Sequence, residues 1–378
     1  MERICDDKKC TGCMACYNIC PMNAISMTYN ERTELSPIID NEKCINCNLC
    51  QTICPANNSI DVVEPKKVYA CWNLDEEKRK TSSSGAIAYT LYEKIIENDG
   101  IVFGCSYDDN LQLKFSYAES INDIEKYKTS KYSHAYIGES YKKVEEFLNS
   151  SKEVLFVGTP CQIQGLKNFL RKDYDNLYLV DLICHGVPSQ LIINEYIKFL
   201  NLDNKPTNMT FRGIYSFILT LYNNNDIIYQ KTSKEDPYYY AFLNSLFYRE
   251  SCYQCKFAQP KRGGDLTIGD FWKIGTDIPF NHDISSGVST MLVNTEKGAK
   301  LFNSIKPNIF YEERTFEEAI AGNGQLSAPS KKNQYYDLFK ELYAKYGFNR
   351  AMEECFQKMQ ELRRKYYENR NNVNAKNN

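Results

Sequence analysis

Two matching stretches near the start of the chain decide its organisation: CTGCMACYNICP at Cys10–Pro21 and CINCNLCQTICP at Cys44–Pro55. Each has the spacing C-x2-C-x2-C-x3-C-P, which binds paired 4Fe-4S clusters. Three thiolates on one tight loop reach three irons of one cluster, whereas the fourth, beside the proline, serves the other cluster. The spacing predicts two ligand sets, which are Cys10, Cys13, Cys16 and Cys54, and Cys44, Cys47, Cys50 and Cys20.

Other uses of these cysteines fit the pattern less well. Zinc ribbons need two pairs of ligands rather than two matched triads, each with a remote cysteine. A disulfide framework is typical of secreted chains, but the charged segment Met1–Cys10 has no apolar signal region. Cys5 would complete the plant-type spacing of a 2Fe-2S centre, yet the second run has Ile39 in the equivalent place. We therefore expect a bacterial-type ferredoxin domain with two 4Fe-4S clusters.

The composition is that of an ordinary globular protein. The chain has 378 residues, of which 43% are hydrophobic and 25% charged, and its length suits about two or three domains. A net charge of -2 gives no support to binding of nucleic acid or anionic membranes. No run of about 18 apolar residues predicts a membrane span. Sixteen cysteines without an export signal indicate metal or redox chemistry in the cytoplasm.

Changes in pattern along the chain predict three parts. A strand at Ser59–Val63 and a linker at Glu64–Lys67 end the ferredoxin domain, which we place at residues 1–66. Strands and helices then alternate over residues 67–330, which predicts a larger α/β or α+β domain with a mixed sheet. Residues 331–378 form a helical segment, with an Asn-rich tail beyond Asn369 that we expect to be disordered.

The middle of the chain predicts a βαβ unit. Its expected elements are a strand at Glu153–Gly158, a helix at Gln162–Arg171, a strand at Leu177–Cys184 and a helix at Ser189–Leu200. Because ligands bind at the carboxyl ends of parallel strands, Cys161 and Cys184 are expected to face each other there. Cys252 and Cys255 could complete a four-thiolate set, although C-x2-C alone also suits zinc or a redox dithiol, and single cysteines are often only buried.

Four segments in this order resemble the coenzyme F420 hydrogenase/dehydrogenase beta-subunit family, which also includes plant 7-hydroxymethyl chlorophyll a reductase. They are VLFVGTPCQ at Val154–Gln162, DLICHGVPS at Asp181–Ser189, C-x2-C at Cys252–Cys255 and GDFW at Gly269–Trp272. The resemblance extends over approximately Val68–Ala328. It implies FAD and a third 4Fe-4S cluster, with Cys161, Cys184, Cys252 and Cys255 as ligands. No role is predicted for Cys5, Cys71, Cys105 or Cys355.

Two helix starts rich in small residues are candidates for binding the FAD pyrophosphate, because exposed N–H groups and the helix dipole favour anions. The candidates are Ser82, Ser83, Ser84 and Gly85 before a helix at Ala86–Asn98, and Gly158, Thr159 and Pro160 before the helix at Gln162–Arg171. Lys128, Ser130 and Lys131 could add charge and hydrogen bonds. Simple helix capping is the alternative. No G-x-G-x-x-G follows a strand, so a Rossmann nicotinamide site is unsupported.

We expect an FAD-dependent iron-sulfur oxidoreductase. Its ferredoxin-type clusters would exchange single electrons with a ferredoxin or similar carrier, and the flavin would exchange a hydride with a small organic substrate or a deazaflavin such as coenzyme F420. His185 is the candidate proton donor, with orientation of its loop as the alternative role. A non-catalytic electron-transfer subunit of a larger complex is the alternative function. The sequence selects no substrate and allows oligomers.

Overall fold

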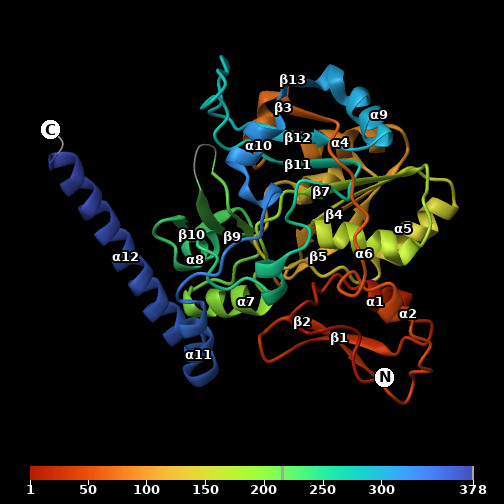
Figure 1. The fold of residues 1–378 in the computed structure, drawn as a ribbon, viewed down its shortest axis with the longest axis horizontal. Helices are drawn as coiled ribbons and strands as arrows, with labels where there is room; N and C mark the ends of the chain where they lie inside the picture. The colour runs from red at the N-terminus through yellow and green to blue at the C-terminus, as the bar shows by residue number, and fades with distance from the viewer. Residues whose placement is uncertain (214–216, 377–378) are drawn as a thin grey trace.

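The computed structural model describes residues 1–213 and 217–376, and its first part is a small domain that carries both cysteine runs (Figure 1). The elements of this domain are helices α1 (Ala15–Ile19) and α2 (Leu49–Thr52) and the antiparallel strands β1 (Ile25–Tyr29) and β2 (Leu35–Ile39). Met14 and Asn48, in equivalent places of the two runs, both precede their helices in the left-handed conformation with φ of 60°. The repeat in sequence is therefore also a repeat in backbone geometry.

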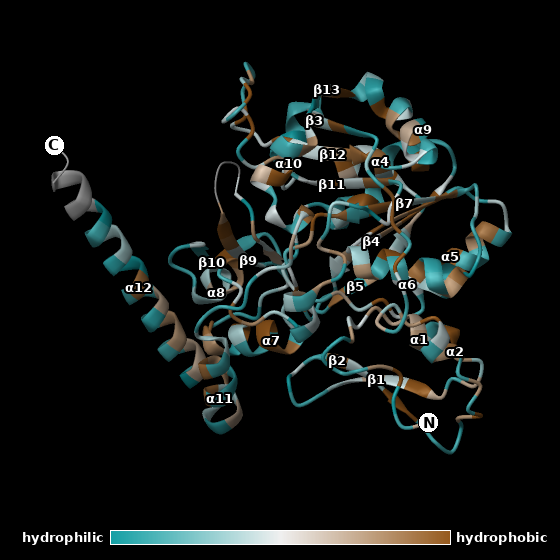
Figure 2. Ribbon diagram, viewed as in Figure 1, coloured by the Kyte–Doolittle hydropathy of each residue, from teal (hydrophilic) through white to brown (hydrophobic). Residues whose placement is uncertain are grey.

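The larger domain is built on a mixed sheet of eight strands among the described residues, in the order β13-β3-β12-β11-β7-β6-β4-β5. The strands are β3 (Lys67–Asn73), β4 (Ile101–Tyr107), β5 (Leu113–Ala118), β6 (Val154–Gly158), β7 (Leu177–Leu182), β11 (Leu266–Asp270), β12 (Ser289–Val293) and β13 (Ile309–Arg314). The four central strands β4, β6, β7 and β11 are parallel, and antiparallel strands flank them on both sides. Figure 2 shows hydrophobic residues on these central strands, as expected for a sheet covered on both faces.

Helices cover the two faces of the sheet. Helices α4 (Ile87–Glu97) and α9 (Glu296–Ile305) pack on one face, where they meet Leu155 of β6. Helices α5 (Ser140–Asn149) and α6 (Pro160–Leu170) pack on the other face, where they meet Phe156. Because successive strand residues point to opposite faces, Leu155 and Phe156 serve different cores.

The ferredoxin domain is docked rigidly on this second face. Met14, the N-cap residue of helix α1, and Ala15, its first residue, are 1% and 0% exposed and share a core with Ile163 and Leu166 of α6. A side chain at Gly165 would place its Cβ 3.1 Å from the sulfur of Cys13 and 3.0 Å from the hydroxyl of Tyr141. The absence of a side chain at this position of α6 therefore allows the cysteine loop to approach the helix.

A second subdomain combines a small sheet with the carboxyl-terminal helices. Its elements are β8 (Asn208–Thr210), β9 (Ile218–Asn223), β10 (Asp226–Thr232), α7 (Gln190–Phe199), α8 (Pro237–Leu243), α11 (Tyr336–Tyr346) and α12 (Phe348–Lys376). Phe339, Met352 and Cys355 of the last two helices are fully buried in one core with Tyr196 and Tyr238. Cys355 is therefore a core residue.

The remaining elements are short. They are α3 (Glu76–Lys80), α10 (Phe316–Gly322) and 3-10 turns at Ile121–Tyr127, Glu250–Gln254, Lys306–Asn308 and Gly324–Leu326. In the described residues no helix is both long enough and apolar enough to span a membrane.

The mixed-sheet fold class predicted from the sequence is confirmed, but several details differ. No strand forms at Ser59–Val63, where only Val63 pairs, as an isolated bridge with Arg262. The preceding Asn58 instead donates its side-chain amide to the backbone oxygens of Thr52 and Cys54, and such local bonds compete with a strand ladder. At the other end of the chain, α12 continues to Lys376, through most of the segment predicted to be disordered, and residues 377–378 lie outside the described part.

Two element boundaries matter for the site. Strand β7 ends at Leu182 rather than Cys184, because the chain leaves the sheet after Ile183, whose N–H still bonds to Ile268. Helix α6 begins at Pro160, whose fixed φ suits the first position of a helix, so Cys161 lies in the first helical turn.

A buried ion pair joins the segment after Cys255 to the central sheet. Asp181 of β7 is 0% exposed and Arg262 is 2% exposed, and their side chains meet at 2.9 Å. Asp181 also accepts a hydrogen bond from the Gly264 N–H at 3.0 Å, and Arg262 donates to the Phe257 carbonyl at 3.2 Å. This pair fixes the Cys252–Cys255 segment against the end of β7.

Replacing Asp181 by Asn should destabilise the protein by about 3–5 kcal/mol, because it leaves the buried Arg262 without a countercharge. The free energy of unfolding, measured with denaturant on the anaerobically purified protein, tests this. The surface variant Asp173→Asn should change it by no more than about 0.5 kcal/mol. Equal losses in the two variants would contradict the role of the ion pair.

Candidate functional site

The first predicted set of thiols is brought together inside the ferredoxin domain. Cys10, Cys13, Cys16 and Cys54 are all buried. Burial, and then its neighbours Cys13, Cys10 and Cys54, raise the pKa of the Cys16 thiol well above its ordinary value. The unassigned Cys5 lies beside this set: its thiol hydrogen-bonds to Cys10, which lowers the pKa of Cys10 to about 6. We call these four ligand candidates, without Cys5, the first thiol set.

The second thiol set, Cys20, Cys44, Cys47 and Cys50, lies nearer the surface. All four residues line one small cavity of about 20 Å³. Cys47 is exposed to solvent, whereas Cys50 is buried, and burial together with Cys20 and Cys47 raises the pKa of the Cys50 thiol. Cys16 of the first set lies close enough to Cys50 for the two thiols to interact.

The third thiol set converges from three parts of the larger domain. Cys161 lies in the first turn of α6, Cys184 lies two residues beyond β7, and Cys252 and Cys255 lie in and just after a 3-10 turn. All four line a cavity of about 40 Å³. Burial, followed by Cys161 and Cys255, raises the pKa of the Cys184 thiol to about 12. The pKa of Cys252 is raised in the same way by burial, Cys184, Cys255 and Cys161.

The four thiols of each set are suited to bind a positively charged iron-sulfur core. Four buried thiolates repel one another and are poorly solvated, which is why the pKa of Cys184 is raised, and a bound iron core would relieve both penalties. Within residues 1–213 and 217–376, no three His, Cys, Asp or Glu side chains are arranged to hold a single metal ion. The four corners of a 4Fe-4S cluster are separate irons, so its thiolates surround a volume rather than one point.

The three thiol sets follow one another through the protein. The pKa of the Cys13 thiol is raised to about 12, first by burial and also by Cys54 of its own set and Cys161 of the third set. Cys13 therefore marks the point where the first and third sets meet. Cys184 and His185 line the small cavity of the third set and also a much larger cavity next to it.

The large cavity has a volume of about 620 Å³ and opens at the carboxyl ends of the parallel strands. Eight of the ten predicted FAD residues line it, namely Ser82, Ser83, Ser84, Lys128, Ser130, Lys131, Gly158 and Thr159. Gly85 and Pro160 do not line it. A Cβ at Gly85 would lie 2.3 Å from the Cys71 carbonyl, so this glycine is required by packing. Cys71 itself is buried in the sheet.

The serine loop does not cap helix α4, so simple helix capping, the alternative to a ligand role, does not apply to it. The N-cap is Ala86, which has a φ of 61° and no side-chain cap bond. Ser82 donates to the Lys78 carbonyl at 2.8 Å, and Ser83 accepts from the Ser130 hydroxyl at 2.9 Å. The hydroxyl of Ser84 is buried and has no partner. The first turn of α4 therefore faces the cavity without a side-chain cap.

The start of α6 is capped by its own residues. The side-chain oxygen of Gln162 accepts from the Thr159 N–H at 2.9 Å and from the Thr159 hydroxyl at 3.0 Å. The Thr159 hydroxyl also lies 3.2 Å from the Cys161 sulfur. Helix capping thus accounts for Gly158, Thr159 and Pro160 without a ligand.

The two lysines at the cavity wall differ in their surroundings. Lys128 forms an ion pair with Glu125 at 2.9 Å and lies 4.2 Å from the centre of the Tyr89 ring. Lys131 donates to backbone oxygens, the shortest contact being 2.6 Å to Lys128, and forms no ion pair with a described carboxylate. Burial lowers the pKa of Lys131. Lys131 is therefore the less neutralised of the two at this wall, where Cys105 is also found.

Sequence analysis missed a third cation at the cavity. Arg212 forms an ion pair with Asp270 at 2.5 Å and lies 4.1 Å from the centre of the Phe217 ring. Its Nε is buried without a partner. Asp270 and Trp272 belong to the GDFW segment, but nothing in the sequence pairs that segment with Arg212. His185 also lines this cavity; its side chain keeps exposed surface, and desolvation by the surrounding protein lowers its pKa.

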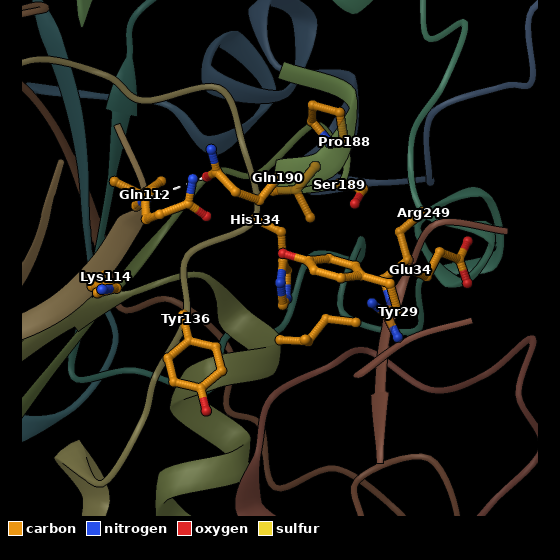
Figure 3. A pocket seen from close by; sticks show the side chains of 13 residues that line it. Tyr29, Glu34, Gln112, Lys114, His134, Tyr136, Pro188, Ser189, Gln190 and Arg249 are labelled. Carbon is orange, nitrogen blue, oxygen red and sulfur yellow. Dashed lines mark hydrogen bonds between the residues drawn. The ribbon is translucent and has the colours of Figure 1, made fainter. Parts of the chain in front are cut away.

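A smaller cavity of about 150 Å³ lies where the β1–β2 hairpin meets the larger domain (Figure 3). Tyr29 and Glu34 line it from the hairpin, and His134 and Arg249 line it from the larger domain. His134 contacts the Thr11 carbonyl at 3.2 Å through Nε2. Burial, and then Arg249, lower the pKa of His134 to about 3.

Comparisons with known proteins agree with this organisation. Residues 151–319 match the family described as the C terminus of the coenzyme F420 hydrogenase/dehydrogenase beta subunit, and residues 9–58 match the 4Fe-4S dicluster domain. The chain is similar to both families in these regions. The family resemblance and the ferredoxin-type domain predicted from the sequence are thereby confirmed, and the chain is an iron-sulfur redox protein related to F420 hydrogenase beta subunits.

Solved structures similar to this chain include a chain of the F420-reducing [NiFe] hydrogenase complex from Methanosarcina barkeri, studied by xenon derivatization. The two chains share 17% sequence identity, with a TM-score of 0.47. The match covers 79% of this chain and 94% of that chain. Among curated proteins, no sequence matches this chain.

The low pKa of His134 predicts a loss of stability in mild acid. The unfolded histidine takes up a proton below its ordinary pKa of 6.5, whereas the folded one stays neutral down to about pH 3. This group should therefore lower the free energy of unfolding by about 1.4 kcal/mol between pH 7.5 and 5.5. Denaturant unfolding of the His134→Gln variant should show a smaller pH dependence by that amount, and the surface variant His282→Gln should not.

Proposed function

We propose that the chain is an FAD-dependent iron-sulfur oxidoreductase that passes electrons between a ferredoxin-type carrier and a small organic substrate or a deazaflavin such as coenzyme F420. The observation that carries the proposal is the order of the sites: exposed second set, buried first set, third set, large cavity. A chain of one-electron sites that ends at a cofactor-sized cavity is suited to joining a protein carrier to a small molecule.

The three thiol sets would each hold one 4Fe-4S cluster. The second set is the candidate entry point because Cys47 is exposed, and a surface cluster can exchange electrons with another small carrier. The first set would be the intermediate site, and Cys161 of the third set is its neighbour. Cys184 brings the third set to the wall of the large cavity.

The large cavity fits a flavin dinucleotide. Its volume of about 620 Å³ is within the range of cofactor sites. The first turn of α4 lacks a side-chain cap, and the Ser84 hydroxyl and the Arg212 Nε have no partners. Together with Lys131, these groups would bind anionic oxygens, as the pyrophosphate of FAD requires. When bound, FAD would supply the conversion between one-electron and two-electron chemistry.

His185 is placed between the third thiol set and the large cavity. Its pKa is lowered by burial, and the charge of Arg212 acts in the same direction while that of Asp270 opposes it. A neutral imidazole at this place can hold a proton on one ring nitrogen and accept one on the other. We infer that His185 would move a proton to or from the substrate.

Turnover of the purified chain tests the proposed function. The photoreduced or dithionite-reduced protein should be reoxidised by a small acceptor, and coenzyme F420 is the first acceptor to measure. If only a partner protein reoxidised the reduced chain and no small acceptor did, the reductase assignment would be contradicted and an electron-transfer subunit would be favoured.

The double variant Cys161→Ala, Cys184→Ala should lose about four irons and four acid-labile sulfides per chain, because it removes half of the third thiol set. Iron and sulfide analysis of anaerobically purified protein measures this. Cys355→Ala, which changes a buried cysteine outside the three thiol sets, should keep the full iron content. An unchanged iron content in the double variant would reject the third cluster.

Replacing Ser84 by Asp should reduce the FAD content at least tenfold, because a carboxylate at the first turn of α4 repels the pyrophosphate. An acidic residue near a helix amino terminus does not weaken the helix, so lost FAD would not reflect lost folding. The flavin-to-protein ratio after reconstitution measures the effect. The neutral isostere Ser84→Asn is the matched control and should retain at least half of the flavin.

A further inference from the structure

Arg249 is a buried cation without a carboxylate partner. It is 4% exposed, and none of the described acidic residues forms an ion pair with it. Its Nε donates to the Cys10 carbonyl at 2.7 Å, and its Nη2 is buried without any partner. Figure 3 shows the side chain at the cavity between the hairpin and the larger domain, close to Glu34 and Tyr29.

The nearby polar groups do not neutralise Arg249. The Glu34 carboxylate is used elsewhere, because it pairs with Arg32 at 3.2 Å and accepts from the Glu250 N–H at 2.6 Å. His134 is uncharged at neutral pH. Burying a guanidinium without a countercharge is unfavourable in free energy, so an anionic group is expected beside Arg249 once the cofactors are bound.

The charge of Arg249 acts on cysteines of both the first and the third thiol sets. Besides the hydrogen bond with Cys5, the charge of Arg249 and a hydrogen bond from it lower the pKa of Cys10, which belongs to the first set. The same charge lowers the pKa of Cys161, which belongs to the third set, against the larger effect of burial. In the geometry, Thr11, next to the Gly12 position that Arg249 contacts, lines the cavity of the third set, and the Cys252 N–H donates to the backbone carbonyl of Arg249 at 2.9 Å. Arg249 does not line the small cavity of the second thiol set.

The loop that carries the first set is fitted closely around Arg249. Gly12, between Cys10 and Cys13, has a φ of 66°. A Cβ at this position would lie 2.8 Å from Cε1 of His134 and 3.0 Å from Nη1 of Arg249. The loop can therefore approach the guanidinium only because it has no side chain here, and a low-dielectric contact of this kind gives a charge a large effect.

We propose that Arg249 is the shared counter-ion of the clusters on the first and third thiol sets, and that it raises the reduction potentials of both. The inference rests on the proposed function, because it assumes a cluster on the third set. One electron leaves one cluster and arrives on the other, and no bond or proton is exchanged. Since one cation lies beside both clusters, the moving charge stays next to the same positive group, which keeps the two potentials similar. Arg249 thus influences electron transfer through its charge, by setting the reduction potentials of the two clusters.

Potentiometric titration followed by electron paramagnetic resonance, on the full chain purified anaerobically, tests the inference. In Arg249→Gln, two of the three reduction steps should move to lower potential. Each potential should fall by at least about 59 mV, which corresponds to a tenfold change in the equilibrium constant for one electron. Arg249→Lys, which keeps the charge, should change both steps by less than half of that. The step of the second thiol set is the internal control and should not move.

Unchanged potentials in Arg249→Gln with full iron content would overturn the inference, and so would equal shifts in Arg249→Lys. If Arg249→Gln does not retain its iron, the pair His134→Glu and His134→Gln replaces it under the same criterion. A glutamate at this position would neutralise Arg249 and lower both potentials, and glutamine would not. Iron content distinguishes failure of this inference from failure of the proposed function. A chain that holds only two clusters would refute the third cluster, while the potential of the first cluster would still report the effect of Arg249.

Discussion

The packing of helix α1 on helix α6 is the contact on which the arrangement of the sites depends. Met14 and Ala15 are buried against Ile163 and Leu166, and the missing side chain of Gly165 leaves room for Cys13. Because α6 starts at the carboxyl end of β6, this contact also fixes Cys161 relative to Cys13. A ferredoxin unit on a flexible tether would not keep the first and third thiol sets adjacent. Here the hydrophobic core of the larger domain includes the cluster loop itself.

Charge is the second organising factor, because the protein buries more positive groups than it neutralises at these sites. Lys131 and the Nε of Arg212 face the large cavity, and Arg249 faces the junction of two thiol sets. By contrast, Arg262 has a complete set of partners in Asp181 and nearby carbonyls. The arginines therefore differ in how completely their nitrogens are used: Arg262 is fully bonded within the fold, whereas Arg212, despite its ion pair with Asp270, and Arg249 each keep a buried nitrogen free for an anionic group.

Sequence reasoning predicted the central elements well. The predicted order of strand, helix, strand and helix corresponds to the observed β6, α6, β7 and α7. Sequence reasoning failed where one local sequence pattern is compatible with two structures. The serines at Ser82–Ser84 are good capping residues in isolation, but Ser83 bonds to Ser130, from a loop far along the chain, and the cap is left to Ala86. No strand forms at Ser59–Val63, and the preceding Asn58 donates its side-chain amide back to the backbone oxygens of Thr52 and Cys54.

By itself, the sequence determined the two cysteine repeats, the ferredoxin-type domain and the family resemblance of the larger domain, because cluster-binding triads and strand-end motifs are set by spacing over a few residues. The tertiary structure alone decided the rest. Cys161, Cys184, Cys252 and Cys255 meet only because β6, β7 and β11 are neighbours in the sheet and because Asp181 holds Arg262. Arg212 and Arg249 have no sequence signature, since what distinguishes them is a buried guanidinium nitrogen without a partner: the Nε of Arg212 and the Nη2 of Arg249. Burial and unmet charge are properties of the folded chain, and no local pattern encodes them.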